Sequence, residues 1–454
     1  MDNHRPSKKN APLAGRMIIY LETLGCAKNL VDSEVMLGYL SRSGYRFTTV
    51  PEEAEIIIIN TCAFIKEATR ESIDTILQVA ELKQHGSCRQ LVVCGCLPQR
   101  YGRELLQALP EVDLFLGTGE LQNIATYLRR LSAGQKPPRL RAAKRSFLMN
   151  AKTPRVLSTA GASAYIKIAE GCSHHCTYCT IPGIRGPYQG RPAGSVVAEA
   201  RQLARKGIRE INLISQDTGQ YDNLSSLLRR LAAIPDIAWI RILYCHPRNL
   251  DRETIAVLAG EEKVCKYIDL PLQHIADSVL KRMGRHMTRK QTERLLARIR
   301  KASPETAVRT TFMVGFPGES KRDFEELLRF AEEIRFDHMG VFRYRDESGT
   351  PASRMSGSVP EQIKNERFHR LMRLQAAVSK EKNRARKGAL LEVLVEGTQP
   401  RPPYRYQART RFQAPEVDGV VLLRDAAVPG SFQNVRITRT FTYDLAGSPE
   451  NEKT

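Results

Sequence analysis

The chain has 454 residues, of which 42% are hydrophobic and 26% charged, and its formal net charge is +21. This length exceeds what one hydrophobic core organises, so we expect two or three domains. No apolar run approaches the roughly 20 residues of a membrane-spanning helix, and the basic start of the chain lacks the apolar core of a secretory signal, which argues against membrane and exported proteins. Ten cysteines without an export signal indicate metal, cluster or redox chemistry in the cytoplasm rather than a disulfide framework.

Positive charge is unevenly distributed along the chain. The formal net charge is +7 over residues 1–160, +14 over residues 161–387 and zero over residues 388–454. Such an excess indicates a polyanionic partner, most simply RNA. Residues 129–155 carry nine basic side chains and no acidic one. A solvated linker and a contact with ribosomal or transfer RNA both stay open for this run.

The N-terminal part alternates short apolar runs with helical periods, which is typical of an open parallel α/β sheet. After a flexible tail at residues 1–15, we expect this domain to occupy residues 16–131. Strands are predicted at residues 17–22, 56–60, 91–95 and 112–116. Helices are predicted at residues 33–43, 65–83 and 121–131. A basic linker is expected at residues 132–160.

The β/α alternation resumes over residues 161–387 and predicts an open or partial (β/α) barrel, whose chemistry lies at the carboxyl ends of the strands. Its strands are predicted at residues 164–169, 210–215, 239–244, 267–270, 309–314 and 338–344, followed by a basic helix at 361–387. Short strands and turns over residues 388–450 then predict a small antiparallel β-barrel. The fold class is therefore α/β with a C-terminal β-barrel.

Three cysteines stand close together after the first barrel strand, in EGCSHHCTYCTIPGIRG. They are Cys172, Cys176 and Cys179, and their placement predicts a site at the mouth of the barrel. A [4Fe–4S] cluster normally has four cysteine ligands, so three leave one iron open to a substrate or cofactor. The alternative is zinc, with His174 or His175 as the fourth ligand.

A second set of three cysteines is spread over the N-terminal domain. Cys26, Cys62 and Cys96 each follow a predicted strand. Because ligands gather at the carboxyl ends of the strands in open parallel sheets, these cysteines are candidate ligands of one metal site. The alternative is three small core residues. We expect that structural role for Cys94, which lies within a predicted strand, and for Cys88.

The cysteine loop, with Tyr178 before its last cysteine, resembles the signature of radical S-adenosylmethionine (SAM) enzymes. The resemblance implies that Cys172, Cys176 and Cys179 hold a [4Fe–4S] cluster that binds SAM and cleaves it to a 5′-deoxyadenosyl radical. Over nearly the whole chain the pattern resembles the methylthiotransferase family, whose last domain is the TRAM β-barrel. The motifs LGCAKNLVDSE, NTCAFI and CGCLPQR then assign Cys26, Cys62 and Cys96 to a second cluster, which holds or supplies sulfur.

Within that family, the motifs YIDLPLQHIAD, LKRMGR, APEVDGVV and FTYDLAG are similar to the branch that modifies a ribosomal protein. The implied reaction is methylthiolation of an aspartate β-carbon in the twelfth protein of the small ribosomal subunit. The zero net charge of the terminal barrel favours this branch, because a barrel that binds transfer RNA should be basic. Implied partners are this ribosomal protein, ribosomal RNA through the basic regions, and an unidentified electron donor. A transfer RNA adenosine methylthiotransferase and a non-catalytic, zinc-containing RNA-binding protein are the alternatives.

Several other residues are candidates at the barrel mouth. Ser215, Gln216 and Asp217 end a predicted strand, where they would either contact the amino or ribose groups of SAM or cap the next helix. His246 and His274 also end strands, and burial with a hydrogen bond is the simpler expectation, with substrate contact as the alternative. The glycines of GFPGES, residues 315–320, permit a close approach of the backbone to a cofactor. We expect structural roles for the last two cysteines, Cys245 and Cys265.

Overall fold

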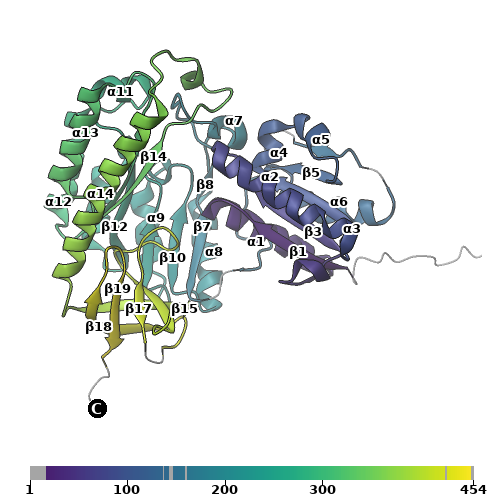
Figure 1. Cartoon of the computed structure of the whole chain (residues 1–454). Helices are drawn as coiled ribbons and strands as arrows, with labels where there is room; N and C mark the ends of the chain where they lie inside the picture. Colours follow the sequence, from purple (N-terminus) through teal and green to yellow (C-terminus); the bar gives the residue numbers. More distant parts are fainter. Residues whose placement is uncertain (1–16, 136, 143–146, 159–160, 425–426, 451–454) are drawn as a thin grey trace, which may run out of the picture. The chain divides into compact units, whose positions relative to one another are not determined.

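The computed structural model describes residues 17–135, 137–142, 147–158, 161–424 and 427–450. The tail predicted at residues 1–15 lies outside these ranges. The chain divides into two compact units, which Figure 1 colours along the sequence. The N-terminal unit comprises Met1–Leu157 and Gly183–Gly186, and the C-terminal unit comprises Ser158–Pro182 and Pro187–Thr454. No helix in the described ranges is long and apolar enough to cross a membrane.

The N-terminal unit is built on a six-stranded parallel sheet in the order β2-β1-β3-β4-β5-β6. The strands are β1 (Ile18–Thr23), β2 (Arg46–Phe47), β3 (Ile56–Thr61), β4 (Gln90–Gly95), β5 (Leu114–Gly117) and β6 (Leu140–Arg141). All four predicted strands are present. The two additional strands are two-residue edge strands, too short to give a periodic pattern, and β6 lies in the segment predicted as a linker.

Helices cover both faces of this sheet, as its sequence pattern requires. The four consecutive isoleucines of β3 are fully buried, and they point alternately to the two hydrophobic clusters on the two faces. One face carries α1 (Ala27–Arg42) and α6 (Ile124–Ser132). The other carries α2 (Lys66–Ala80), α3 (Leu82–His85), α4 (Cys96–Tyr101) and α5 (Glu104–Ala108). The open parallel α/β domain is thus confirmed.

The C-terminal unit contains a second parallel sheet of six strands in the order β14-β13-β12-β11-β10-β7. The strands are β7 (Ser163–Lys167), β10 (Glu210–Ile214), β11 (Trp239–Ile242), β12 (Val264–Gln273), β13 (Ala307–Val314) and β14 (His338–Arg343). They correspond to the six predicted strands, in sequential order. This sheet is the expected open, partial barrel.

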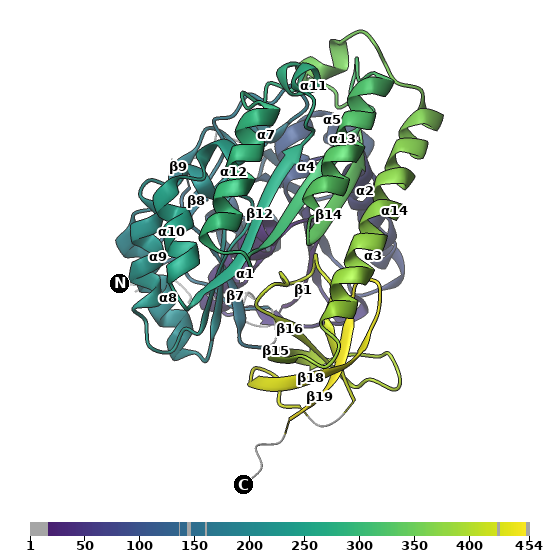
Figure 2. The ribbon, with the colours of Figure 1, turned by 90° about the vertical axis from the view of Figure 1, so that its left-hand side faces the viewer.

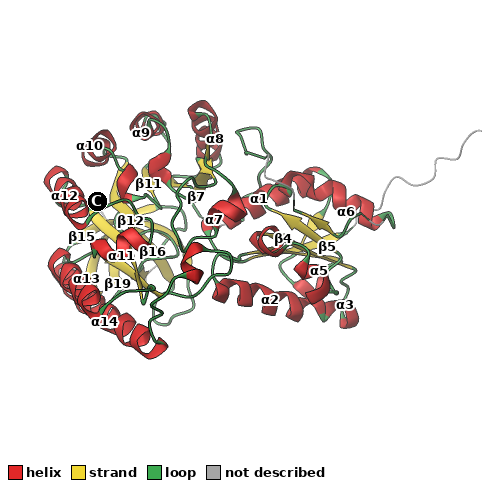
Figure 3. Cartoon of the chain, turned by 90° about the horizontal axis from the view of Figure 1, so that it is seen from above, coloured by secondary structure: helices red, strands yellow, loops and turns green. Residues whose placement is uncertain are grey.

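Helices line the outside of this curved sheet, as Figures 2 and 3 show. They are α8 (Ala193–Arg205), α9 (Leu224–Ala232), α10 (Arg252–Gly260), α12 (Arg289–Ala302), α13 (Lys321–Ile334) and α14 (Glu361–Ala385). Further short elements of this unit include α11 (Asp277–Arg282), β8 (Ala169–Glu170) and β9 (Gln189–Gly190). The short helix α7 (Ile181–Arg185) belongs mainly to the N-terminal unit, which includes Gly183–Gly186. Each parallel pair needs a crossover, which α8, α9, α10, α12 and α13 supply, whereas α14 follows the last strand and leads to the terminal barrel.

The chain ends in a closed five-stranded barrel in the order β15-β16-β17-β19-β18. Its strands are β15 (Leu390–Thr398), β16 (Tyr406–Thr410), β17 (Val421–Leu423), β18 (Phe432–Thr440) and β19 (Leu445–Pro449). The predicted barrel is confirmed, but β17 and β19 pair in parallel. In a closed ring of five strands the directions cannot alternate throughout, so at least one pair must be parallel.

A buried ionic cluster joins this barrel to the parallel sheet of the same unit. The Glu210 carboxylate, at the start of β10, lies 2.5 Å from Arg409 Nη2 of β16 and 3.0 Å from Arg241 Nη2 of β11. All three side chains are at most 1% exposed. Burial opposes the ionisation of Glu210, but the two arginines outweigh it and lower its pKa to about 2.

Glu210→Gln is expected to lower the free energy of unfolding by about 3 kcal/mol at neutral pH, because it leaves two buried arginines without this carboxylate. A carboxyl group with a depressed pKa contributes its stability above its ordinary pKa of 4.5 and loses it as the pH falls toward 2. The difference between variant and wild type should therefore shrink below pH 4.5. Urea unfolding between pH 7 and pH 3 measures it.

Glu392→Gln provides the matched control for this interface. Glu392 is half exposed, lies 4.0 Å from Arg411 and accepts a hydrogen bond from Trp239 Nε1 at 3.2 Å. Its replacement should cost less than about 1 kcal/mol, because exposed ion pairs contribute little. Equal losses in the two variants would show that the ionic cluster does not anchor the barrel.

Candidate functional site

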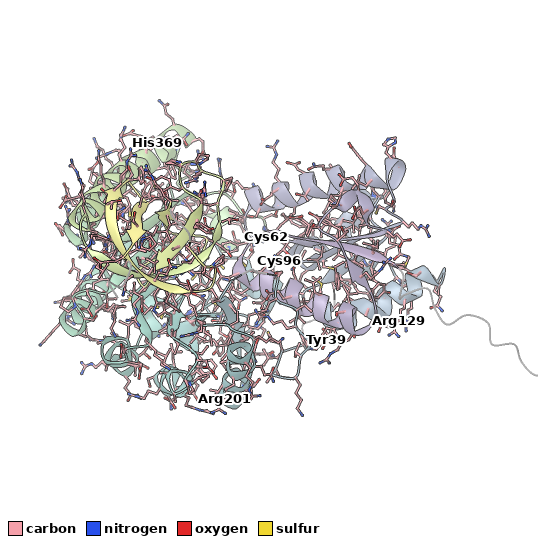
Figure 4. The ribbon with its side chains drawn as sticks, turned by 90° about the horizontal axis from the view of Figure 1, so that it is seen from below. Tyr39, Cys62, Cys96, Arg129, Arg201 and His369 are labelled. Carbon is pink, nitrogen blue, oxygen red and sulfur yellow. The ribbon has the colours of Figure 1, made fainter. Side chains whose placement is uncertain are left out.

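The first candidate site lies at the carboxyl edge of the N-terminal sheet. Cys26 is the N-cap residue of α1, Cys62 directly follows β3, and Cys96 is the first residue of α4, directly after β4. Gly25, with φ of +93°, comes so close to Cys62 that a Cβ at position 25 would lie 2.6 Å from the Cys62 Cβ. Figure 4 shows Cys62 and Cys96 close to each other.

The electrostatics of these cysteines reflect their proximity. Burial, together with the nearby Cys96 and Cys26, raises the pKa of Cys62 to about 12. Burial also raises the pKa of Cys96, against the opposing charge of Arg185. Burial acts in the same direction on Cys26, but Lys28 and Arg185 hold its pKa below the ordinary value. Metal binding replaces the thiol protons, so a cation here would bind in competition with them.

Polar side chains that the sequence analysis did not identify surround this edge. Asn29 Nδ2 donates to the carbonyl oxygens of Leu24 (2.9 Å) and Thr61 (3.0 Å), and so joins the start of α1 to β3. The Cys96 thiol lies 3.8 Å from Asn29 Oδ1. Arg185, from the segment that follows Cys179, reaches the same place and is buried. These two partners of Cys96 are 67 and 89 positions away from it in the sequence, so only the folded chain brings them together.

The remaining cysteines of this sheet have different surroundings. Cys94 lies within β4 and is fully buried, and it belongs to the hydrophobic cluster on the face opposite to that of Cys96. Burial raises its pKa well above the ordinary value. Cys88 is buried, and its thiol donates to the Gln90 carbonyl at 3.5 Å. Both are placed as core residues.

The second candidate site is the cysteine loop of the C-terminal unit, at residues 172–179. Backbone and side-chain hydrogen bonds fix Thr177 to the end of α11, because Thr177 N donates to Met283 O at 3.0 Å and its hydroxyl to Arg282 O at 2.9 Å. Thr177 O in turn accepts from Ala352 N at 2.8 Å. The buried Arg285 lies with Nη1 3.9 Å from Cys176 Sγ. The LKRMGR motif thus holds the loop.

A polar network supports the start of this loop. His174 Nε2 donates to Asp217 Oδ2 at 2.7 Å, and its backbone N–H points at Cys172 Sγ at 3.4 Å. Asn249 Nδ2 donates to the same Asp217 oxygen at 2.6 Å. The His174 ring stacks on His246 at 4.2 Å between centroids. This network engages His174, while His175 is exposed.

Asp217 links the network to the strand end. Its other carboxylate oxygen accepts from the backbone N–H groups of His246 (2.9 Å) and Gly219 (3.0 Å), and the second of these bonds caps a short 3₁₀ helix at Thr218–Gln220. The capping role weighed for Asp217 is therefore present. Contact between this residue and SAM stays a prediction.

Asp217→Asn is expected to slow reductive cleavage of SAM about 10- to 100-fold, the usual cost of removing a supporting residue around a metal site. In the variant, an amide NH2 group takes the place of the Oδ2 atom that accepts hydrogen bonds from His174 and Asn249. Both of these hydrogen bonds are therefore lost. A SAM cleavage assay measures the effect. Asp251→Asn is the control, since Asp251 only caps α10 through Thr254 N and asparagine caps equally well. An unchanged rate in Asp217→Asn would contradict the supporting role.

Two polar atoms at the end of β10 are buried without a hydrogen-bond partner among the described residues. They are Ser215 Oγ and Gln216 Oε1. The Gln216 amide Nε2 donates to Glu170 Oε1 at 3.1 Å, which fixes the side chain. An unsatisfied buried polar atom is costly, so both atoms are available for a polar ligand at this edge.

Aromatic and apolar side chains close the other side of the loop. Tyr178 packs edge-on against Phe316 with 6.3 Å between ring centroids, and both belong to a small hydrophobic cluster. Phe316 is part of the GFPGES turn. The Glu319 carboxylate holds this turn, because it accepts hydrogen bonds from the Phe316 N–H at 3.0 Å and from Arg367 Nη1 at 2.8 Å. Burial raises the pKa of Glu319 to about 7 against these contacts.

The other strand-end candidates are engaged within the protein. His246 Nδ1 accepts from Arg248 N at 3.2 Å, and burial, aided by Arg285, lowers the pKa of His246 to about 2. His274 Nδ1 accepts from Ala276 N at 3.1 Å, and burial lowers its pKa to about 3. Both are buried, hydrogen-bonded and neutral. Cys245 and Cys265 are fully buried.

Within the described residues, no three His, Cys, Asp or Glu side chains are close enough together to hold one metal ion. A [4Fe–4S] cluster makes a different demand, because each cysteine binds a different iron and the ligand sulfurs stay apart. Two separate cysteine triads, each at the carboxyl edge of a parallel sheet, suit such clusters.

Three known families match successive parts of the chain. They are the uncharacterized protein family UPF0004 at residues 18–117, the radical SAM superfamily at residues 166–331, and the TRAM domain at residues 388–449. Together with the partial barrel and its cysteine loop, these matches define a radical SAM enzyme that carries a UPF0004 domain and a TRAM barrel.

Full-length relatives narrow this class. The ribosomal protein uS12 methylthiotransferase RimO of Geobacter sulfurreducens is 48% identical over 438 residues, covering 94% of this chain and 98% of that protein. The protein of the same name from Pelobacter propionicus is 47% identical over 437 residues, covering 94% and 97%. The chain belongs to the ribosomal protein uS12 methylthiotransferase family.

Solved structures support the fold. The radical SAM methyltransferase TsrM of Kitasatospora setae, with tryptophan substrate and a SAM analogue bound, aligns with a TM-score of 0.56 at 16% identity, covering 85% of this chain and 79% of that chain. A second TsrM structure, with cobalamin and a [4Fe-4S] cluster bound, gives a TM-score of 0.55 at 17% identity, covering 74% and 77%. At this identity the likeness concerns the fold alone.

Proposed function

We propose that this protein methylthiolates the β-carbon of an aspartate in ribosomal protein uS12, the twelfth protein of the small subunit. The observation that carries the proposal is the pair of strand-end cysteine triads in a chain that aligns over 94% of its length with proteins named for this activity. The transfer RNA alternative has weaker support, because the terminal barrel carries no net charge.

Two [4Fe–4S] clusters and SAM are the proposed cofactors. Cys172, Cys176 and Cys179 would hold one cluster, and Cys26, Cys62 and Cys96 the other. The donor sets fit, since both are soft thiolates with three ligands each. The buried Ser215 Oγ and Gln216 Oε1 suit the polar groups of SAM, and Asp217 follows them in the sequence. Tyr178, within the cysteine loop, packs on Phe316 and is a further proposed SAM contact. When bound, these groups supply the radical and sulfur chemistry, which no side chain provides.

The chain itself contributes position and exclusion of water. The His174, Asp217 and Asn249 network orients the first turn of the cysteine loop. Arg285 places a fixed positive charge beside Cys176. The packing of Tyr178 on Phe316 keeps one side of the loop apolar.

Ribosomal RNA is a proposed second contact, and the cytoplasm is the proposed location, which the names of the uS12-modifying relatives support. In the C-terminal unit a hollow of about 710 Å³ is lined by nine residues, of which none is acidic. Its basic members Arg248, His286, Arg294 and Arg298 are all exposed. Such a surface suits phosphate groups. The electron donor is an unidentified redox partner.

Replacing Arg294 and Arg298 together with glutamate is expected to weaken binding of a ribosomal RNA hairpin and to flatten its salt dependence. Filter binding at several salt concentrations measures both quantities. Arg201 and Arg205 of α8, replaced in the same way, are the control for net charge alone. Equal losses in both double variants would show a nonspecific effect and contradict a contact at the hollow.

The substrate is tested in cells with and without the gene. Intact masses of the small-subunit proteins are compared, and transfer RNA from the same cells is digested in parallel. Loss of a methylthio group from uS12 alone is the expected result. An unchanged uS12 beside a missing thiomethylated adenosine would overturn the substrate. A colourless, zinc-containing protein after anaerobic purification would overturn the chemistry and favour the RNA-binding alternative.

A further inference from the structure

Arg185 occupies a position that the proposed reaction does not explain. It follows Cys179 by six residues in the sequence, yet its segment, Gly183–Gly186, packs as part of the N-terminal unit. Its side chain is 3% exposed. A guanidinium is charged at every accessible pH, so burial at this depth requires specific partners.

Arg185 contacts three side chains at the edge that carries Cys26, Cys62 and Cys96. Arg185 Nη1 lies 2.7 Å from Asp32 Oδ2 of α1. Arg185 Nη2 lies 2.5 Å from Asn29 Oδ1 and 3.3 Å from Cys96 Sγ. One planar fork thus reaches a carboxylate, an amide oxygen and a cysteine sulfur at the same time.

The carboxylate and the amide orient the fork toward the sulfur. Asp32 is itself 5% exposed and balances the charge, while Asn29 is held by the Leu24 and Thr61 carbonyls. Rotation of the guanidinium away from Cys96 would break these bonds. The contact with the sulfur is therefore built in by the surrounding side chains.

A second buried arginine, Arg155, also pairs with a carboxylate of α1 and provides the comparison for Arg185. Arg155 donates from Nε (2.8 Å) and Nη2 (2.6 Å) to the single oxygen Oε2 of Glu34. Its side chain is 8% exposed and that of Glu34 1%. Two arginines thus bind neighbouring carboxylates of α1, and one of them also contacts a candidate cluster ligand.

We propose that Arg185 is a positioning residue for the second cluster. Its guanidinium holds the Cys96 sulfur in place and donates a hydrogen bond to it. Hydrogen bonds to ligand sulfurs and nearby charge set the reduction potential of an iron–sulfur cluster. A fixed positive charge stabilises the more reduced state, so Arg185 raises the potential. The inference rests on the proposed function in one respect, namely that Cys26, Cys62 and Cys96 hold a cluster.

The test uses the full chain with Cys172, Cys176 and Cys179 replaced by alanine, so that all bound iron belongs to the N-terminal set. After anaerobic reconstitution, iron and sulfide are counted, and the potential is titrated by electron paramagnetic resonance. The parent should bind about four irons. Arg185→Met, Arg185→Lys and Arg155→Met are compared in this background, with circular dichroism as the check on folding.

Arg185→Met is expected either to lose more than half of the iron or to keep it with a lowered potential. Arg185→Lys should show a smaller change of the same sign, because lysine keeps the charge but not the fork that spans Asp32 and Cys96. Arg155→Met should match the parent. Should Arg185→Met fail to fold, the lysine variant decides.

Iron content and potential that are unchanged in the Arg185 variants would overturn the inference while leaving the proposed function intact. Equal changes in Arg155→Met would also overturn it, because the effect would then come from the packing of α1. A parent chain that binds no iron would overturn the second cluster itself, and the inference with it.

Discussion

Cys172→Ala should abolish reductive cleavage of SAM and with it all methylthio product. Cys172 is buried, and its sulfur faces the His174 backbone N–H in a loop fixed at Thr177. The loop supplies three thiolates in eight residues, so removal of one leaves two ligands for a cluster that needs at least three. Cleavage is measured as release of 5′-deoxyadenosine under reducing, anaerobic conditions, and we expect it to fall to the level without protein.

Cys265→Ala is the matched control for that loss. Cys265 is fully buried in the same unit, but it lies near the start of β12, at the edge of the sheet opposite to the cysteine loop. Its replacement removes a thiol of the same size and should leave cleavage near the wild-type rate. Substantial cleavage in Cys172→Ala would exclude this loop as the radical site.

Cys62→Ala should have the second largest effect, which is selective. Cleavage of SAM should persist, because the cysteine loop of the C-terminal unit is intact, whereas transfer of sulfur to the uS12 substrate should be lost. The iron content should fall from about eight to about four per chain. Mass spectrometry of the substrate peptide and an iron assay on the same sample measure both effects.

Cys94→Ala separates the role of Cys62 from simple loss of a buried thiol. Cys94 lies on the neighbouring strand β4, and it is fully buried in the cluster on the opposite face from Cys96. We expect full iron content and normal product. Methylthiolated substrate from Cys62→Ala would show that the second cysteine set does not supply the sulfur.

Most of the fold was predictable because its signals are local. A parallel strand buried on both faces is a continuous apolar run, as in the four isoleucines of β3, and its end is marked by the next polar residue or cysteine. The start of α1 was predicted six residues too late, because the polar Lys28, Asn29 and Asp32 interrupt the apolar pattern although Asn29 and Asp32 are helical and buried. Strand β19 has no clear alternation, because it contains glycine, serine and proline, and its pairing with β17 joins residues more than 20 positions apart.

The candidate site was predictable to the level of its cysteines and no further. Spacing and strand ends singled out the six cysteines, and the strand end singled out Ser215, Gln216 and Asp217. The contacts that support these residues were not predicted, because the partners are far apart in the sequence. Asp217 and His174 are 43 positions apart, Arg285 and Cys176 are 109 apart, and Arg185 and Asn29 are 156 apart.

By itself, the sequence determined which cysteines can hold clusters, where the long buried strands lie and how charge is divided among the domains, because these properties depend on neighbours along the chain. Only the tertiary structure decided which charged side chains face the sulfurs. An arginine six residues after Cys179 has the same local pattern whether it is solvated or buried against Cys96. Its burial becomes favourable only when α1 brings Asp32 and Asn29 to the same edge, and that is a property of the packed fold.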